Sequence, residues 1–207
     1  DWVGAEQPAE GAALSTGFVL GSAPARLLRF EDALRPDAEA AVARLRSQGL
    51  APAILSGDRA KAVEAIGHQL AVDATGELSP ADKFASIERL SVSGRRVLMV
   101  GDGLNDGPAL KAAHVSIAPS SASDVGQTAA DLLFLGDRLM PVPVAVAAAR
   151  RTMTVVRQNF ALAIGYNVLA VPLAIAGYVT PLIAALAMSG SSLIVVANAL
   201  RLRSAAR

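Results

Sequence analysis

The chain has 207 residues, of which 53% are hydrophobic and 4% aromatic, and its 19 basic side chains nearly balance 18 acidic ones. This composition excludes a disordered or collagen-like chain and one with an acidic or basic tail. All of the acidic side chains lie before residue 158, so that part is mildly acidic and gives no reason to expect nucleic-acid binding. Because there is no cysteine, disulfides and thiolate metal sites are excluded within this chain. The chain begins at Asp1 with nothing that resembles a signal peptide, so we interpret it as part of a longer protein.

The first two thirds of the chain alternate between short apolar runs and helical patterns. Residues 16–20 and 25–30 flank Gly21-Ser22-Ala23-Pro24, which is typical of a β-hairpin. Further strands are expected at 50–55, 96–100, 115–118 and 132–135, and helices at 36–49, 61–70, 83–93, 108–113 and 124–130. This alternation predicts an α/β domain whose five or six strands are parallel and whose site lies at their carboxyl ends.

The last third of the chain is apolar enough to predict membrane-spanning helices. A helix over 139–157 leads into residues 158–200, a run of 43 residues without any charge or histidine. Since about 20 apolar residues span a bilayer, this run suffices for two helices, about 158–178 and 182–200. Arginines flank the run on both outer sides and none lies in the turn, which predicts a cytoplasmic soluble domain. The alternative is a buried core hairpin of a soluble protein.

A glycine-rich loop carries the strongest chemical signal. Gly101-Asp102-Gly103-Leu104-Asn105-Asp106-Gly107-Pro108 follows an apolar strand directly. Two carboxylates four residues apart at a strand end suit a hard cation such as Mg²⁺, which prefers oxygen ligands and keeps some of its waters. A solvated turn, in which the Asp and Asn side chains satisfy backbone amides, is the alternative.

Two further segments strengthen the functional interpretation. Ser56-Gly57-Asp58 also lies at a strand end, where a hydroxyl and exposed amides can bind a phosphoryl group, although the pattern also fits an N-cap. Lys83 supplies a positive charge that could neutralise a phosphoryl oxygen, although a lone lysine is usually solvated. A hydroxyl, a lysine and paired carboxylates in this order are a less accidental set than any one of them.

These residues resemble a known family. Their order is similar to that of the haloacid-dehalogenase superfamily, and Leu34-Arg35-Pro36-Asp37 with the three segments above resembles the phosphorylation domain of P-type ATPases. Gln158-Asn159-Phe160, Met188-Ser189-Gly190-Ser191-Ser192 and residues 198–202 resemble the last two membrane helices of heavy-metal pumps. The resemblance implies a haloacid-dehalogenase-like Rossmannoid phosphorylation domain at 30–138, preceded by the end of a nucleotide-binding domain and a return hairpin at 1–29. A linker helix and two transmembrane helices would occupy 139–207.

The resemblance also implies roles for individual residues. The implied phosphoryl-binding and catalytic residues are Ser56, Gly57, Asp58, Lys83, Asn105 and Asp106. Asp102 and Asp106 would hold Mg²⁺, with Asp58 ordering its loop and Asn105 completing the polar network. ATP would be the substrate and Cu(I) the transported ion.

Elements that the family needs are missing from the sequence. No Asp-Lys-Thr-Gly carrying the nucleophilic aspartate occurs, and neither His68 nor His114 precedes a proline as in the nucleotide domain. The chain is therefore expected to be inactive alone. The implied partners are the lipid bilayer, the upstream remainder of the pump and a copper chaperone, and the implied location is a bacterial inner or cell membrane.

The polar residues of the apolar run bear on the metal. Met188, Ser191 and Ser192 share one face of the last predicted helix, and Tyr166 and Asn167 lie in the preceding one. Polar groups in hydrocarbon tend to mark a transport path, although small residues there also permit close helix packing. The resemblance to copper(I) pumps, and a thioether's suitability for Cu(I), favour a copper site formed by these five residues.

One segment of the α/β part resembles a particular subgroup of copper pumps. Ala113-His114-Val115-Ser116-Ile117 resembles pumps that supply copper during haem-copper oxidase assembly. The alternatives are a membrane-tethered phosphatase of the same superfamily, a pump for another heavy metal and a non-catalytic membrane anchor. A phosphatase would need an Asp-x-Asp near the chain start, which residues 1–30 lack, and zinc or cadmium pumps would be expected to place an acidic residue in the last helix.

Overall fold

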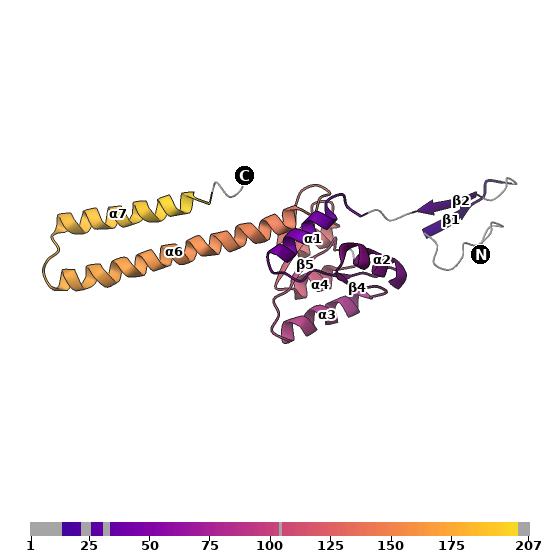
Figure 1. Ribbon diagram of the computed structural model, residues 1–207, viewed down its shortest axis with the longest axis horizontal. Helices are drawn as coiled ribbons and strands as arrows, with labels where there is room; N and C mark the ends of the chain where they lie inside the picture. The colour runs from indigo at the N-terminus through magenta and orange to yellow at the C-terminus, as the bar shows by residue number, and fades with distance from the viewer. Residues whose placement is uncertain (1–13, 22–25, 31–33, 104, 203–207) are drawn as a thin grey trace. The chain divides into compact units, whose positions relative to one another are not determined.

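The elements expected from the sequence are present in the computed structural model, which describes residues 14–21, 26–30, 34–103 and 105–202 (Figure 1). The chain divides into two compact units, Asp1–Met140 and Pro141–Arg207. Each unit is described by itself below. The predicted assignment of residues 1–29 to a nucleotide-binding domain remains a prediction.

The first unit starts with the predicted hairpin. Strand β1, Leu14–Phe18, pairs with β2, Arg26–Phe30, in antiparallel register with Leu14 opposite Phe30. The first strand begins and ends two residues earlier than the apolar pattern indicates. The predicted hairpin is therefore confirmed with a small shift of its first strand.

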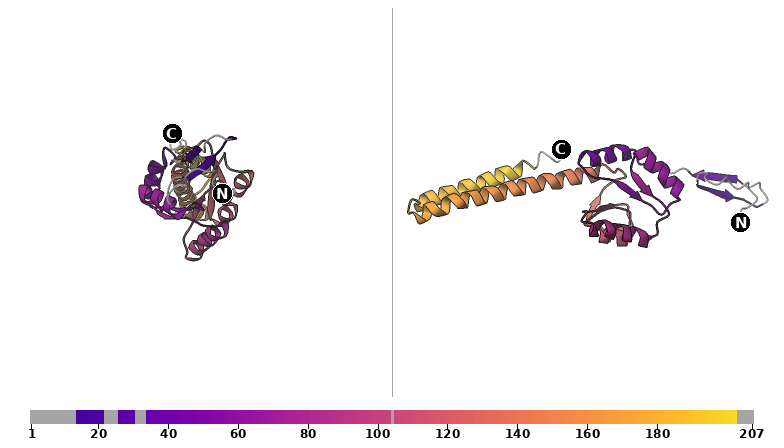
Figure 2. Two further views of the ribbon diagram at one scale, coloured as in Figure 1. Left: turned by 90° about the vertical axis from the view of Figure 1, so that its right-hand side faces the viewer. Right: turned by 60° about the horizontal axis from the view of Figure 1, so that its bottom comes forward.

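The rest of the first unit is the predicted α/β alternation, visible in Figures 1 and 2. Its elements are α1 Ala38–Ser47, β3 Ala53–Leu55, α2 Ala60–Leu70, β4 Asp73–Thr75, α3 Pro80–Val92, β5 Leu98–Val100, α4 Gly107–Ala112, β6 Val115–Pro119, α5 Asp124–Ala129 and β7 Leu132–Phe134. The five strands form a parallel pair, β3 with β4, and a parallel trio, β5 with β6 and β7. The sequence pattern missed β4, and it did not indicate that the strands divide into two hydrogen-bonded groups.

A small apolar cluster fixes the glycine-rich loop and α3 to the same core. Ile87 of α3, Met99 of β5, and Ala109 and Leu110 of α4 are buried together. Ile87 lies one helical turn after Lys83, so burying Ile87 draws the first turn of α3 toward the end of β5. The core thereby sets the distance between the predicted lysine and the predicted carboxylates.

The second unit is a pair of antiparallel helices, α6 Pro141–Ile175 and α7 Pro181–Leu200, which lie side by side in Figures 1 and 2. The predicted linker helix and first membrane helix are one continuous helix of 35 residues. The Thr180 hydroxyl caps α7 by accepting a hydrogen bond from the Ile183 amide. Both helices are long and apolar enough to cross a membrane.

The side chains of Arg35 and Asp37 hold the last residues of the first unit, 137–140, against the start of α1. The Asp37 carboxylate accepts hydrogen bonds from the backbone amides of Leu139 (3.0 Å) and Met140 (2.8 Å), and Arg35 donates to the Asp137 carbonyl at 2.9 Å. Partial burial would raise the pKa of Asp37, but the two amide hydrogen bonds outweigh it, and the pKa lies below its ordinary value. The ionised form is therefore the one that closes the unit.

The lowered pKa of Asp37 predicts a pH-dependent stability. Its contribution is fully present above about pH 4, the ordinary aspartate value, and is lost as the pH falls through the lower value of the folded state. We expect Asp37→Asn to lower the Tm at pH 7, with the gap to wild type narrowing below about pH 4. Circular dichroism of the chain in detergent measures this.

The matched control is Glu39→Gln, which makes the same charge change in the first turn of α1. Among the described residues, the Glu39 carboxylate accepts one hydrogen bond, from the exposed Gln69 side chain. We expect it to change the Tm little at either pH. A gap for Asp37→Asn that is the same at pH 7 and pH 3 would show that the charge of Asp37 is not what closes the unit.

Candidate functional site

The centre of the candidate site is an ion pair between Lys83 and Asp106. The Lys83 Nζ donates to the Asp106 Oδ1 at 2.7 Å, and the two side chains are only 10% and 15% exposed. The two residues are 23 positions apart and lie at the starts of α3 and α4. The structure therefore brings together two of the residues predicted from the sequence.

A capping box places Lys83 in the first turn of α3. The Ser79 hydroxyl accepts a hydrogen bond from the Asp82 amide, and the Asp82 carboxylate accepts one from the Ser79 amide. Hydrogen bonds from the Ser79 side chain and backbone hold the pKa of Asp82 below its ordinary value. Helix α3 starts at Pro80, three residues earlier than predicted, because Ser-Pro-x-Asp is a start signal that the apolar spacing alone does not reveal.

Asp102 has a different environment from Asp106. Asp102 is exposed, and within the described part of the chain neither its carboxylate nor the side chain of Asn105 has a hydrogen-bond or ion-pair partner. Asp106 is partly buried and also crowds Gly101, where an added Cβ would lie 2.9 Å from the Asp106 Oδ2. Of the two carboxylates of the motif, Asp106 is therefore paired with Lys83, whereas Asp102 has no partner among the described residues.

The predicted phosphoryl-binding segment forms a tight turn after β3. The Ser56 hydroxyl donates to the Asp58 Oδ2 at 2.6 Å and accepts a hydrogen bond from the Asp58 amide at 3.2 Å. The Asp58 carbonyl accepts from the Glu77 amide at 2.7 Å, so Asp58 does connect two loops. Ser56 is half-buried and Gly57 is exposed. A phosphoryl oxygen could receive the Ser56 hydrogen bond only in exchange for Asp58.

The donor set fits magnesium held in part by substrate. Among the described residues no group of three or more His, Asp or Glu side chains could hold a metal by itself. Mg²⁺ is commonly bound by one or two carboxylates together with phosphate oxygens and waters, so a dedicated protein cage is not required. The exposed and unpartnered carboxylate of Asp102 is suited to that mode of binding.

The predicted copper ligands are not gathered by the two helices alone. Met188 is 64% exposed, Asn167 and Ser192 are exposed, and Tyr166 and Ser191 are half-buried. The polar side chains bond within their own helices, with Asn167 donating to the Ala163 carbonyl and Ser191 to the Met188 carbonyl. No hydrogen bond joins any two of these five side chains in the described helices, and a copper site formed by them remains a prediction.

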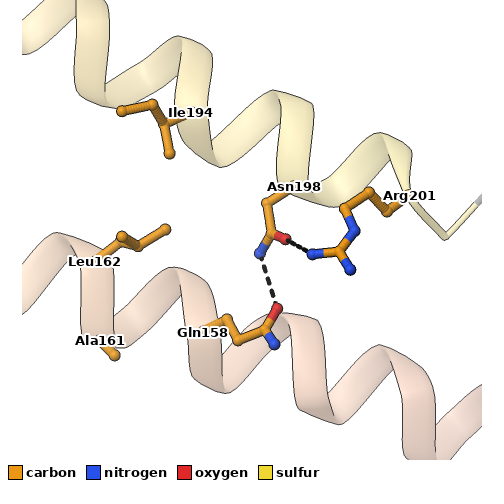
Figure 3. A pocket seen from close by; sticks show the side chains of 6 residues that line it. All are labelled: Gln158, Ala161, Leu162, Ile194, Asn198 and Arg201. Carbon is orange, nitrogen blue, oxygen red and sulfur yellow. Dashed lines mark hydrogen bonds between the residues drawn. The ribbon is translucent and has the colours of Figure 1, made fainter.

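A polar cluster between α6 and α7 was assigned no role by the sequence patterns. The Asn198 side-chain amide donates to the Gln158 Oε1 (3.2 Å) and the Asn159 Oδ1 (2.9 Å), and its oxygen accepts from Arg201 (3.2 Å). Figure 3 shows Gln158, Asn198 and Arg201 of this cluster beside the apolar side chains of Leu162 and Ile194. These residues line an open cavity of about 480 Å³. Such interhelical hydrogen bonds fix the register of two apolar helices.

Comparison with known proteins identifies the family. The model of the haloacid dehalogenase-like hydrolases matches residues 1–114, more than half of the chain. The structure of a zinc-transporting PIB-type ATPase in the E2.Pi state matches with a TM-score of 0.78 and 32% identity, covering 88% of this chain and 31% of that protein. The chain belongs to the heavy-metal P-type ATPases of the haloacid dehalogenase-like family. The predicted fold class is thereby confirmed.

Curated relatives agree with this membership. Nitrogen fixation protein FixI of Rhizobium leguminosarum bv. viciae is 62% identical over 84% of this chain, which is 23% of its own length. The copper-exporting P-type ATPase of Mycobacterium tuberculosis is 41% identical over 87% of this chain and 24% of its own length. The chain spans about a quarter of the length of the curated relatives it matches.

The ion pair predicts a large and asymmetric mutational effect. We expect Lys83→Met to destabilise the first unit by about 3 kcal/mol, because it leaves the Asp106 carboxylate partly buried without a counter-charge. Adding Asp106→Asn should recover part of that loss, and denaturant unfolding of each variant measures it. The control is Lys111→Met, which removes an exposed lysine of α4. Equal effects of Lys83→Met and Lys111→Met would contradict the pairing.

Proposed function

We propose that this chain is part of an ATP-driven copper(I) transporter that couples formation and hydrolysis of an aspartyl phosphate to metal movement across a membrane. The observation that carries the proposal is the difference between the two aspartates at the end of β5. Asp106 is paired with Lys83, whereas Asp102 is exposed and its carboxylate has no partner among the described residues. Phosphoryl transfer requires positioned positive charge and a metal-binding carboxylate rather than further covalent chemistry by the protein. The family membership supplies the reaction class.

The residues of the α/β unit take separate parts in the phosphoryl step. Lys83, held in place by Asp106, balances the charge of the phosphoryl oxygens. The Ser56 hydroxyl donates a hydrogen bond to a phosphoryl oxygen in place of its bond to Asp58, and Gly57, which is exposed, follows it in the chain. Asp102 holds Mg²⁺, which when bound supplies charge neutralisation of the transferred group. Asn105, exposed on the same loop, completes the polar surroundings.

The nucleophile lies outside this chain in our proposal. The sequence contains no Asp-Lys-Thr-Gly, and the first curated relatives are about four times longer than the region matched. We therefore infer that this chain alone completes no catalytic cycle and depends on the remainder of the pump. Helices α6 and α7 would lie in a bacterial inner or cell membrane, with the α/β unit in the cytoplasm and a copper chaperone as metal donor.

Copper is the metal that the helix residues favour. The relatives are divided, since one is named as copper-exporting and the matched solved structure as zinc-transporting. Residues 158–200 contain no carboxylate, the type of ligand that a Zn²⁺ path would be expected to use, whereas the thioether of Met188 is a soft ligand suited to Cu(I). A pump for another heavy metal remains the competing proposal because of the zinc-transporting structure.

The magnesium role of Asp102 predicts loss of phosphorylation in the complete pump. We expect Asp102→Asn to abolish phosphoenzyme formation from radioactive ATP, because it removes the free carboxylate that holds Mg²⁺ against the phosphoryl group. Asp73→Asn, at an exposed position of β4, is the control and should phosphorylate normally. Wild-type acyl-phosphate levels in Asp102→Asn would remove this residue from the mechanism.

The copper assignment predicts a defect confined to transport. Met188→Leu keeps the volume and apolarity of the side chain but deletes its sulfur, so helix packing should be nearly unchanged while Cu(I) coordination is lost. We expect Met188→Leu and Asn167→Ala to lower copper-dependent ATPase turnover and the number of bound Cu(I) ions, leaving phosphorylation from inorganic phosphate intact.

Phosphorylation from inorganic phosphate runs the cycle backwards and needs no transported metal, so it separates a broken transport site from a broken protein. Met153→Leu, an exposed methionine of α6 outside the uncharged run, is the matched control. Unchanged copper binding in both site variants would reject the assignment of Tyr166, Asn167, Met188, Ser191 and Ser192.

A further inference from the structure

The exposed residue Asp102 lies in a backbone segment whose glycines give it high conformational freedom. Gly101 and Gly103 flank it, and Gly103 has a φ of +82°, a region that side chains rarely allow. Glycines lose more conformational entropy on ordering than other residues, so an untethered Gly-Asp-Gly segment would weaken any cation site built on it. Some other part of the unit must therefore hold Asp102 if the carboxylate is to bind a cation well.

Hydrogen bonds to the carbonyl oxygen of Asp102 hold its backbone in place. The backbone amide of Ser123 donates to the Asp102 carbonyl at 3.2 Å, and the Ser123 hydroxyl approaches the same oxygen at 3.4 Å. The same hydroxyl caps α5 by accepting a hydrogen bond from the Gly126 amide at 3.2 Å. Ser123 thus connects the glycine-rich loop to the start of α5, although the two residues are 21 positions apart.

Two glycines allow this connection to be so close. A Cβ added to Gly126 would lie 2.2 Å from the Asp102 carbonyl oxygen, and one added to Gly103 would lie 1.9 Å from the Gly126 Cα. The neighbouring atoms belong to the backbone, so a side chain at either position would fit only if the loop itself were displaced. Gly126 is buried and lies inside α5, where glycine is less favourable than alanine, and the close contact with the loop explains why glycine occupies this position.

We propose that Ser123 and Gly126 are positioning residues that hold the Asp102 loop in the geometry needed to bind Mg²⁺. The proposal rests on the proposed function, in that Asp102 is taken as the magnesium ligand, but it assigns a part to α5 that the reaction itself does not require. A carboxylate that is already held in its metal-binding geometry binds a cation more tightly, because no conformational entropy is lost in ordering it when the cation binds. Ser123 and Gly126 act through Asp102 and do not touch the cation.

The test measures cation binding directly on the detergent-solubilised full-length protein. Mn²⁺ replaces Mg²⁺ as a paramagnetic probe, and the site is defined as the one that Asp102→Asn removes. We expect Gly126→Ala to weaken Mn²⁺ binding at that site at least tenfold, because the added methyl group forces the loop away. Ser123→Ala removes the hydroxyl's hydrogen bond to the Asp102 carbonyl as well as the cap of α5, and the loss of the bond to Asp102 should weaken Mn²⁺ binding about fivefold. Ser123→Thr keeps the hydroxyl and should bind nearly as wild type.

A second measurement separates positioning from general damage. If the loop is only displaced, raising Mg²⁺ should restore phosphoenzyme levels in Gly126→Ala and Ser123→Ala, and Ser123→Thr, which keeps the cap of α5, should have a Tm close to that of Thr128→Ala. Thr128→Ala is the matched control, because Thr128 is an exposed residue of the same short helix. Should Gly126→Ala fail to fold, the comparison of Ser123→Ala with Ser123→Thr decides the question by itself.

Two results would overturn the inference and leave the proposed function standing. One is unchanged Mn²⁺ affinity in folded Gly126→Ala and Ser123→Ala while Asp102→Asn still removes the site. The other is a loss of phosphorylation that saturating Mg²⁺ does not restore. A protein in which Asp102→Asn removes no Mn²⁺ site would instead contradict the magnesium assignment, and with it the proposed function.

Discussion

The geometry of the candidate site depends on the ion pair between Lys83 and Asp106. Two partly buried charges 2.7 Å apart stabilise each other only while both are present, because each has given up hydration that the other replaces. The capping box at Ser79 sets the start of α3, and burial of Ile87 brings that helix against β5 and α4. The lysine is therefore held at the end of β5 by local helix chemistry and by packing at once.

Pairing Asp106 leaves Asp102 as the carboxylate available to a cation. The sequence treats the two aspartates of the loop alike, but the structure gives one a buried lysine and leaves the other exposed between two glycines. In the proposed function, Lys83 therefore balances the charge of the phosphoryl group and Asp102 binds the metal, so the two roles fall to different side chains. The close contact of α5 with this loop supplies the rigidity that its glycines remove.

Local patterns predicted most of the fold and fewer of the site's details. Apolar runs and turn residues sufficed for the hairpin, the helices and four of the other five strands. Strand β4 consists of Asp73, Ala74 and Thr75, with Asp73 and Thr75 exposed, so it carries no apolar run, unlike the equally short β3, β5 and β7. The pairing of Lys83 with Asp106 depends on how α3 packs against α4, which no local spacing encodes. Likewise, Met188 and Asn167 are both exposed on their helices, which the sequence pattern alone does not indicate.

The most direct test of the central claim is the metal dependence of phosphoenzyme formation by the full-length protein. In detergent, radioactive ATP is supplied with Mg²⁺ and with either Cu(I) or Zn²⁺ at matched free concentrations, and the acid-stable, hydroxylamine-sensitive phosphoenzyme is counted. The account predicts phosphorylation that requires Mg²⁺ and is stimulated by Cu(I) but not by Zn²⁺. Stimulation by Zn²⁺ alone would contradict the copper assignment, and the absence of any acyl phosphate would contradict the account as a whole.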